Sequence, residues 1–135
     1  MALLTWTSKY SVGVKALDSQ HTVLFGLLND LHDAMMKGQA QSLSGPLLRK
    51  LVEYTHTHFA AEEQSLAATK YPGLADHRIK HRELIQQVTE YADRFDRGEV
   101  TLNIQLMNFL RDWLSNHIQK VDHDYGPWLN EHGVS

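Results

Sequence analysis

Apolar residues recur along this chain at the intervals of helix faces. In the first such segment Leu17, Leu24, Leu28 and Leu31 lie three, four or seven residues apart, which is typical of an amphipathic α-helix. Three later segments repeat the pattern, and the strict alternation that marks a half-buried strand is absent from the sequence. The predicted helices are residues 18–38, 45–68, 72–97 and 101–124.

Residues that begin or end helices separate these segments. Asp18 is expected to cap the first helix and Gly38 to end it, while Pro46 falls in the first turn of the second. A Tyr-Pro-Gly turn precedes the third helix, which ends near Gly98. Four long helices with short connections predict an all-α, up-down-up-down antiparallel four-helix bundle. Residues before 18 and after 124 are expected to form an N-terminal arm and a short C-terminal cap.

Composition narrows the possible functions. The 135 residues suffice for one domain, and the net charge of −3 offers no basic surface for a nucleic acid. The absence of cysteine excludes disulfides, thiolate metal sites and a cysteine nucleophile. There is no signal-peptide pattern and no apolar run of about 20 residues that could cross a membrane. These features predict a cytoplasmic protein.

Five of the nine histidines lie on the apolar faces of the predicted helices. A lone histidine on such a face is usually a hydrogen-bonded core residue. Five buried imidazoles without a common partner would leave polar atoms unpaired, at about 1–3 kcal/mol each. A shared metal would turn the ring nitrogens into ligands. The five are His21, His58, His77, His81 and His117.

The spacing of ligand-type residues supports a metal site. Residues four apart, such as His58 and Glu62, lie about 40° apart around a helix and roughly 6 Å along it. His77 and His81 form a second such pair. Asp122 follows His117 by five residues, which is about 140° on an ideal helix. If both are ligands, the helix must contain a π-bulge or a loosened turn; otherwise Asp122 is a solvent-facing charge near a helix end.

The segments DSQH, HFAAEE, YPGLADHRIKH and WLSNHIQKVDHDY resemble the hemerythrin family, and above all its single-domain bacterial members. The family pattern is a lone His, then His-x3-Glu, His-x3-His and His-x4-Asp, and this chain has all seven positions. The resemblance implies a non-haem di-iron centre that Glu62, Asp122 and an oxo or hydroxo oxygen bridge. It places His21 and His58 on one iron, and the other three histidines on the second.

The donor atoms agree with iron and with reversible O2 binding. Imidazole nitrogens suit iron better than magnesium or calcium, which prefer oxygen. Two octahedral ions have twelve coordination positions. Five nitrogens and four carboxylate oxygens fill nine, and a bridging oxygen fills one on each ion. The one open position is on the ion with two histidines. Di-iron oxygenases use four Glu and two His. Neutral imidazoles stabilise highly oxidised iron less well, which favours binding over turnover.

We therefore expect an O2 carrier, store or supplier that is not an enzyme. The alternatives are an oxygen, redox or nitric oxide sensing domain, or an enzyme with peroxidase or nitrite/NO reductase activity.

Leu114, Phe25, Phe59 and Trp113 are expected to line an apolar O2 pocket, although core packing explains Phe59 and Trp113 equally well. Further expected ligands are azide and nitric oxide. The protein is expected to be a monomer, and its O2 could pass to an O2-consuming acceptor protein. Glu63 is expected to be solvated.

Overall fold

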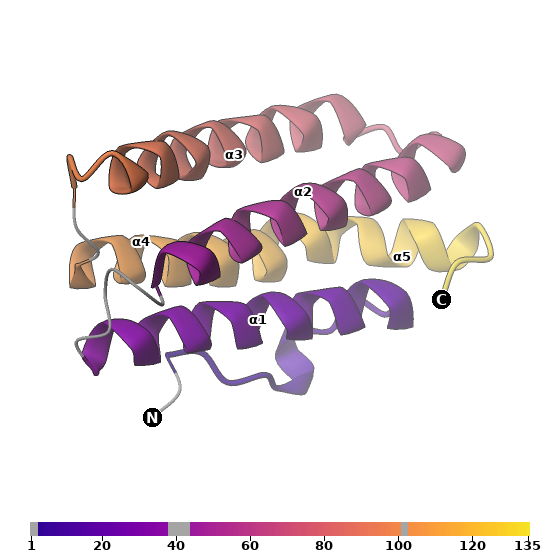
Figure 1. Ribbon diagram of the computed structural model, residues 1–135. Helices are drawn as coiled ribbons and strands as arrows, with labels where there is room; N and C mark the ends of the chain where they lie inside the picture. The colour runs from indigo at the N-terminus through magenta and orange to yellow at the C-terminus, as the bar shows by residue number, and fades with distance from the viewer. Residues whose placement is uncertain (1–2, 38–43, 101–102) are drawn as a thin grey trace.

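Four long helical segments lie side by side in the computed structural model, which describes residues 3–37, 44–100 and 103–135 (Figure 1). Helix α1 spans Lys15–Met36, α2 spans Ser44–Ala68 and α3 spans Leu74–Asp96. The fourth segment is continuous through α4 (Ile104–Asn116), the π-helix η2 (His117–Asp122) and α5 (His123–Glu131). The four segments alternate in direction, so the predicted up-down-up-down bundle is confirmed (Figure 1).

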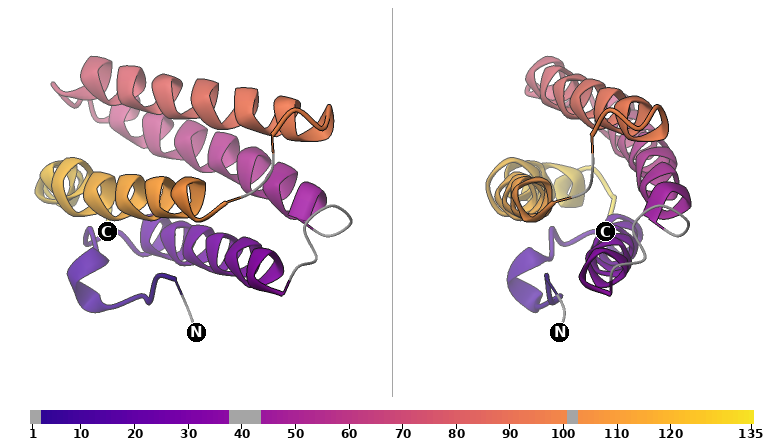
Figure 2. Two further views of the ribbon diagram at one scale, coloured as in Figure 1. Left: turned by 90° about the vertical axis from the view of Figure 1, so that its left-hand side faces the viewer. Right: turned by 60° about the vertical axis from the view of Figure 1, so that its left-hand side comes forward.

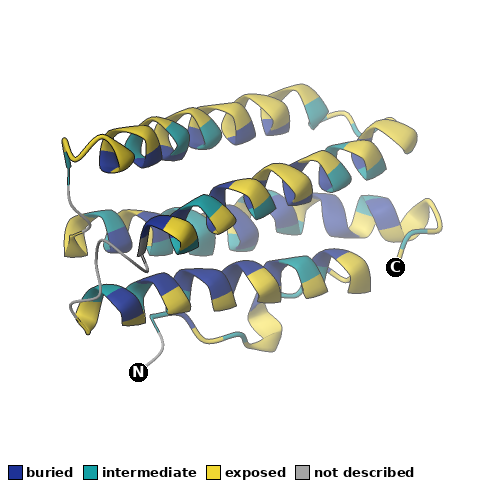
Figure 3. Ribbon diagram, viewed as in Figure 1, coloured by how far each residue is buried: buried dark blue, intermediate teal, exposed yellow. Residues whose placement is uncertain are grey.

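The helices pack through the apolar stripes that the sequence predicts. Helix α2 packs against both α1 and α3, and α1 also contacts α4. Buried positions face the interior of the bundle and exposed positions face outward (Figure 3). Leu31, Leu66 and Met107, from three different helices, have no exposed surface. Among the described residues, no helix is long and apolar enough to cross a membrane.

An N-terminal arm runs along the outside of the bundle, beside α1 and the fourth segment (Figure 2). It includes the short 3-10 helix η1 (Ser8–Tyr10). The Leu4 backbone exchanges two hydrogen bonds with the Asn29 side chain, at 2.9 and 2.8 Å. The arm also approaches Gly126 so closely that a Cβ there would lie 2.3 Å from the carbonyl oxygen of Val12. Only glycine allows this contact between the arm and α5.

The first helix begins earlier than the prediction. Helix α1 starts at Lys15 with Val14 as its N-cap, so Asp18 lies in the first turn and the predicted cap is wrong. The Asp18 carboxylate instead accepts hydrogen bonds from the Val12 amide at 2.8 Å and the Ser11 hydroxyl at 2.6 Å. Asp18 therefore fastens the arm to α1. The predicted stop at Gly38 lies outside the described residues.

The fourth segment extends beyond the predicted end at residue 124. It continues as α5 to Glu131, so only a short tail follows the last helix. Tyr125 and Leu129 are four residues apart and have no exposed surface. These two side chains hold α5 against the core, which explains why the helix does not end after Asp122.

Candidate metal centre

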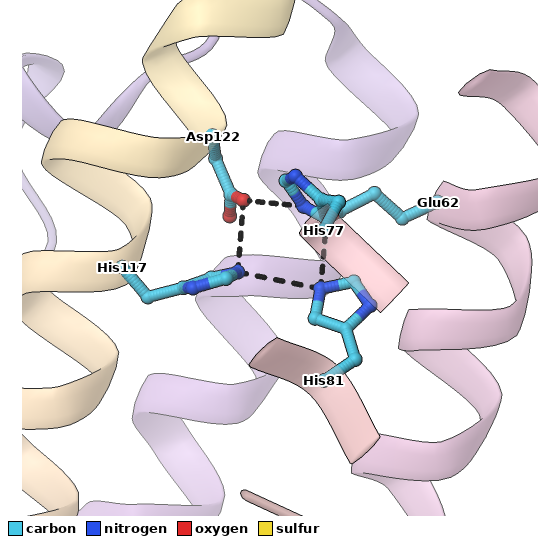
Figure 4. Close-up of side chains that lie close together, drawn as sticks. All are labelled: Glu62, His77, His81, His117 and Asp122. Atoms are coloured by element: carbon cyan, nitrogen blue, oxygen red, sulfur yellow. Dashed lines mark hydrogen bonds and ion pairs between the residues drawn. The ribbon is translucent and has the colours of Figure 1, made fainter. Parts of the chain in front are cut away.

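The seven side chains predicted as ligands come from all four helical segments and meet inside the bundle. Each has at most 6% of its surface exposed. They are His21 on α1, His58 and Glu62 on α2, His77 and His81 on α3, and His117 and Asp122 on η2. Figure 4 shows five of them converging from three segments.

Local helix geometry explains how each pair faces inward. On α2 and α3 the ligand-type residues are four apart, which puts them on one face of a regular α-helix. Between His117 and Asp122 the chain forms a π-helix of six residues. The wider turn brings residues five apart onto one face. The predicted departure from a regular helix is therefore confirmed, and Asp122 is buried rather than solvated.

Three histidines gather around one oxygen from each carboxylate. Nε2 of His77 lies 2.5 Å from Oε1 of Glu62 and 3.1 Å from Oδ1 of Asp122. Nε2 of His81 lies 3.2 Å from the same Glu62 oxygen, and Nε2 of His117 lies 3.1 Å from the same Asp122 oxygen. The Nε2 atoms of His81 and His117 are 3.3 Å apart (Figure 4). We call this set the three-histidine subsite.

The other two histidines face the second oxygen of each carboxylate. Nε2 of His58 lies 3.1 Å from Oε2 of Glu62, and Nε2 of His21 lies 3.5 Å from it. Nε2 of His21 is also 3.3 Å from Oδ2 of Asp122. We call this set the two-histidine subsite. Each carboxylate therefore divides its two oxygens between the two subsites.

The donor separations fit metal binding. Ligands bonded at about 2.1 Å and at right angles to one another lie about 3 Å apart, close to the spacings measured here. Both ring nitrogens of His21 and both carboxylate oxygens of Asp122 are buried without a well-directed hydrogen bond. Such atoms are costly to bury unpaired, and bound metal ions would satisfy both Asp122 oxygens and the Nε2 atom of His21, which faces the carboxylates.

The electrostatics of the chain also favour a cation. Burial disfavours charge on these carboxyl groups, but hydrogen bonds and charges from the surrounding histidines lower the pKa of both Glu62 and Asp122. Burial alone would lower the pKa of His21 and His77, but Asp122 and Glu62 outweigh it and raise each pKa to about 9. Two ionised carboxylates thus lie between the histidines and can receive a cation, which would displace the protons on the rings.

Two residues that hydrogen-bond the outward nitrogens of the histidines were missed by the sequence reasoning. Nδ1 of His58 is 2.6 Å from Oε1 of Gln20, and Nδ1 of His81 is 2.9 Å from Oε2 of Glu63. The prediction that Glu63 is solvated is therefore wrong, because its side chain is 24% exposed and engaged by α3. Each of the two residues is adjacent in sequence to a predicted ligand, but the histidine it contacts lies on another helix.

Tyr125 was missed as well. Its hydroxyl donates a hydrogen bond to Oε2 of Glu62 at 3.1 Å, and burial in a site with two carboxylates raises its pKa well above the ordinary value. It follows Asp122 by three residues, one helical turn, which is the only signal in the sequence. The bond helps to orient Glu62 from the side of α5.

A small apolar cavity adjoins the site. It offers about 30 Å³ to a water-sized molecule, where one water needs about 10–15 Å³. Leu24, one turn after His21, and Thr55, one turn before His58, contribute to its wall, and the Thr55 hydroxyl bonds to the carbonyl of Leu51 at 2.7 Å. The full lining is Leu24, Leu28, Leu51, Thr55, Phe59, Leu84, Val88, Leu110, Trp113 and Leu114.

Three of the four residues expected around a gas pocket line this cavity. Phe59 stacks on His81 with ring centres 3.6 Å apart, and Trp113 stacks on His117 at 4.4 Å. Leu114 is the third. Phe25 is not part of the lining, because its ring packs against Trp6 and Tyr10, at 5.5 and 4.9 Å, on the side of the arm.

The chain matches the model of the hemerythrin HHE cation binding domain over residues 12–129. It is 37% identical to a bacteriohemerythrin from Methylococcus capsulatus over 131 residues, 96% of this chain and 99% of that protein. The chain belongs to the hemerythrin family. It is also similar to a hemerythrin solved as wild type, with a TM-score of 0.91, 37% identity and coverage of 95% and 98% of the two chains. A myohemerythrin from Riftia pachyptila is 29% identical, over 89% of this hemerythrin chain and 88% of its own.

Proposed function

We propose that this protein is a non-haem di-iron protein that binds O2 reversibly. The observation that carries the proposal is the division of the Glu62 and Asp122 oxygens between two histidine subsites. One ion would need one oxygen from each carboxylate, whereas two neighbouring ions use all four. Membership of the hemerythrin family supports the same reading, since its relatives are named bacteriohemerythrin and myohemerythrin.

In this proposal each side chain has a distinct role. His77, His81 and His117 would hold one iron, and His21 and His58 would hold the other. Glu62 and Asp122 would each offer one oxygen to each iron, and an oxo or hydroxo oxygen would complete the bridge. The two-histidine subsite would then have one donor fewer than the three-histidine subsite, which supports an open position on the iron held there. When bound, the irons supply that open position and the electrons for reversible O2 binding.

The rest of the chain protects the site from water. Phe59, Trp113 and Leu114 place apolar surface beside the ligands. The Thr55 hydroxyl donates its hydrogen bond to the backbone carbonyl of Leu51 on the same helix. No other lining side chain among the described residues carries a titratable group. Within this described part of the chain, the apolar lining offers no proton donor to bound O2, and the Tyr125 hydroxyl near the two-histidine subsite is engaged by Glu62. An oxygen-binding protein is therefore favoured over an oxidase or peroxidase.

Iron loading and optical cycling test the proposal. The metal-free protein is loaded with Fe(II) without oxygen, the iron content is measured, and O2 is added and removed repeatedly. We expect two irons per chain and a visible absorption band that appears with O2 and disappears when O2 is removed. One iron per chain, or a band that bleaches irreversibly, would contradict the proposal.

Several finer expectations from the sequence remain predictions. We propose azide and nitric oxide as further ligands at the open position, and an O2-consuming acceptor protein as a partner. A cytoplasmic location and a monomeric state are proposed on composition and on the lack of an apolar surface stripe. Fractionation and light scattering would test the last two.

A further inference from the structure

The two subsites differ in the group that accepts a hydrogen bond from an outward-facing ring nitrogen. In the three-histidine subsite, His81 contacts a carboxylate oxygen of Glu63 at 2.9 Å. In the two-histidine subsite, His58 contacts the amide oxygen of Gln20 at 2.6 Å. An anion therefore lies behind one subsite and a neutral amide behind the other. Neither Glu63 nor Gln20 faces the centre itself.

The Glu63 carboxylate is held in place rather than free at the surface. Its Oε1 accepts a hydrogen bond from Nε of Arg78 at 3.2 Å, which leaves Oε2 for His81. Arg78 and His81 are both on α3, whereas Glu63 is on α2. The arrangement thus links the two helices and orients one carboxylate oxygen toward the imidazole. Arg78 is about half exposed, so water partly screens its charge.

Hydrogen bonds of this kind change what a metal-binding histidine does. An Nδ1–H that donates outward leaves the Nε2 lone pair free to face the centre, and it fixes the orientation of the ring. A carboxylate acceptor draws the proton more strongly than an amide does. The ring then becomes the more basic ligand and stabilises the more highly charged metal ion.

We infer that Glu63 is a positioning residue that makes the three-histidine subsite the tighter metal site and the one that favours Fe(III). Gln20 serves the two-histidine subsite with a weaker acceptor. The inference rests on the proposed binding of two ions. It implies that the iron bearing the open position is the more weakly held and the more readily kept as Fe(II).

Metal titration of the metal-free protein tests this without any O2 chemistry. Co(II) is added in competition with a chelator, and histidine ring N–H signals shifted by the bound ion report which subsite fills. We expect the wild type to fill the three-histidine subsite first. Glu63→Gln should weaken that subsite by roughly 10–100-fold and leave the other unchanged. Gln20→Glu should strengthen the two-histidine subsite, and the double exchange should reverse the order of filling.

The reduction potential supplies a readout that a purely structural role would not move. A tenfold loss of Fe(III) affinity relative to Fe(II) corresponds to about 59 mV, so Glu63→Gln should raise one of the two potentials by at least this amount. Arg78→Gln should shift it in the opposite direction, because Glu63 would then face His81 without a competing cation. Glu83→Gln, an exposed neutral replacement on α3, is the control and should change neither.

The outcomes separate the two proposals. If the wild type binds one Co(II) or one iron, the proposed di-iron function fails whatever the variants do. If it binds two and Glu63→Gln leaves both affinities and both potentials as in the wild type, or shifts both subsites equally, the role of Glu63 is refuted.

Discussion

The two carboxylates of the centre reach it by different local structures. Glu62 follows His58 by four residues on the regular helix α2, whereas Asp122 follows His117 by five on the π-helix η2. Both side chains have no exposed surface, and both divide their oxygens between the same two subsites. The comparison teaches that ligand convergence does not require one fixed spacing. Where the two ligands are five residues apart, the chain forms a π-helix instead of an α-helix.

Neutralising either carboxylate should have the largest effect. Glu62→Gln and Asp122→Asn each remove a negative charge that both ions share, so metal binding at both subsites should weaken by more than about 100-fold. This exceeds the effect expected from replacing a residue that only hydrogen-bonds a ligand. Iron content and Co(II) titration measure this. Glu53→Gln and Asp124→Asn, exposed neighbours on the same segments, are the controls. A variant that weakens only one subsite would show that its carboxylate does not bridge.

The two carboxylates should make the stability of the metal-free protein depend on pH through His21 and His77. Burial alone would lower the pKa of His21 and of His77, but hydrogen bonds and charges from Asp122 and Glu62 raise each pKa from 6.5 to about 9. A raised histidine pKa stabilises the fold fully below pH 6.5, and the stabilisation is lost as the pH rises through about 9. This corresponds to about 3 kcal/mol for such a group.

Urea unfolding of the metal-free protein at pH 6 and pH 9 tests that expectation. The free energy of unfolding should fall with rising pH, and Asp122→Asn and Glu62→Gln should each flatten this dependence. Metal affinity should change in the opposite direction, rising toward pH 9, because bound metal must displace the ring protons. A free energy of unfolding that rises over this interval would contradict the assignment.

All four helical segments contribute to the cavity wall, and one leucine from α2 and one from α4 allow two of these contributions to be compared. Leu114 is one turn before His117, and its replacement by alanine should speed azide entry and autoxidation severalfold. Leu51 is two turns from His58 and buried, so Leu51→Ala should lower stability by about 2–5 kcal/mol with a smaller effect on ligand entry. Stopped-flow azide binding and thermal unfolding measure the two effects. Equal azide rates in both variants would remove Leu114 from the entry path.

Deleting Lys120 should have the smallest effect. His117 and the aspartate would then be four residues apart, as on α2, and a regular α-helix could present both to the centre. We expect metal affinity to stay within about tenfold of the wild type, and circular dichroism to show an intact helix. Deleting Ala60 is the matched change in α2. It would leave His58 and the glutamate three residues apart instead of four, and it should abolish metal binding. Loss of metal in the Lys120 deletion would mean that the π-turn itself is required.

Periodicity and spacing predicted most of the centre, for a physical reason. Ligands on one helix are related by a fixed rotation and rise, so the pairs on α2 and α3 could be placed from the sequence. The same arithmetic identified the π-turn, because His117 and Asp122 could not meet otherwise. Helix ends were less certain, since the Asp18 carboxylate can cap a helix or bind the arm, and only the arm's position decides which it does.

The chain by itself determined which residues lie on the inner face of each helix and which donor atoms they offer. The packing of the helices decided which side chains from other helices contact the ligand residues. Glu63 and Gln20 find their histidines on neighbouring helices, Tyr125 reaches Glu62 across the bundle, and Phe25 turns toward the arm instead of the cavity. Contacts within a helix follow from its repeat, whereas contacts between helices depend on the angle and rotation at which whole segments pack, which no local spacing encodes.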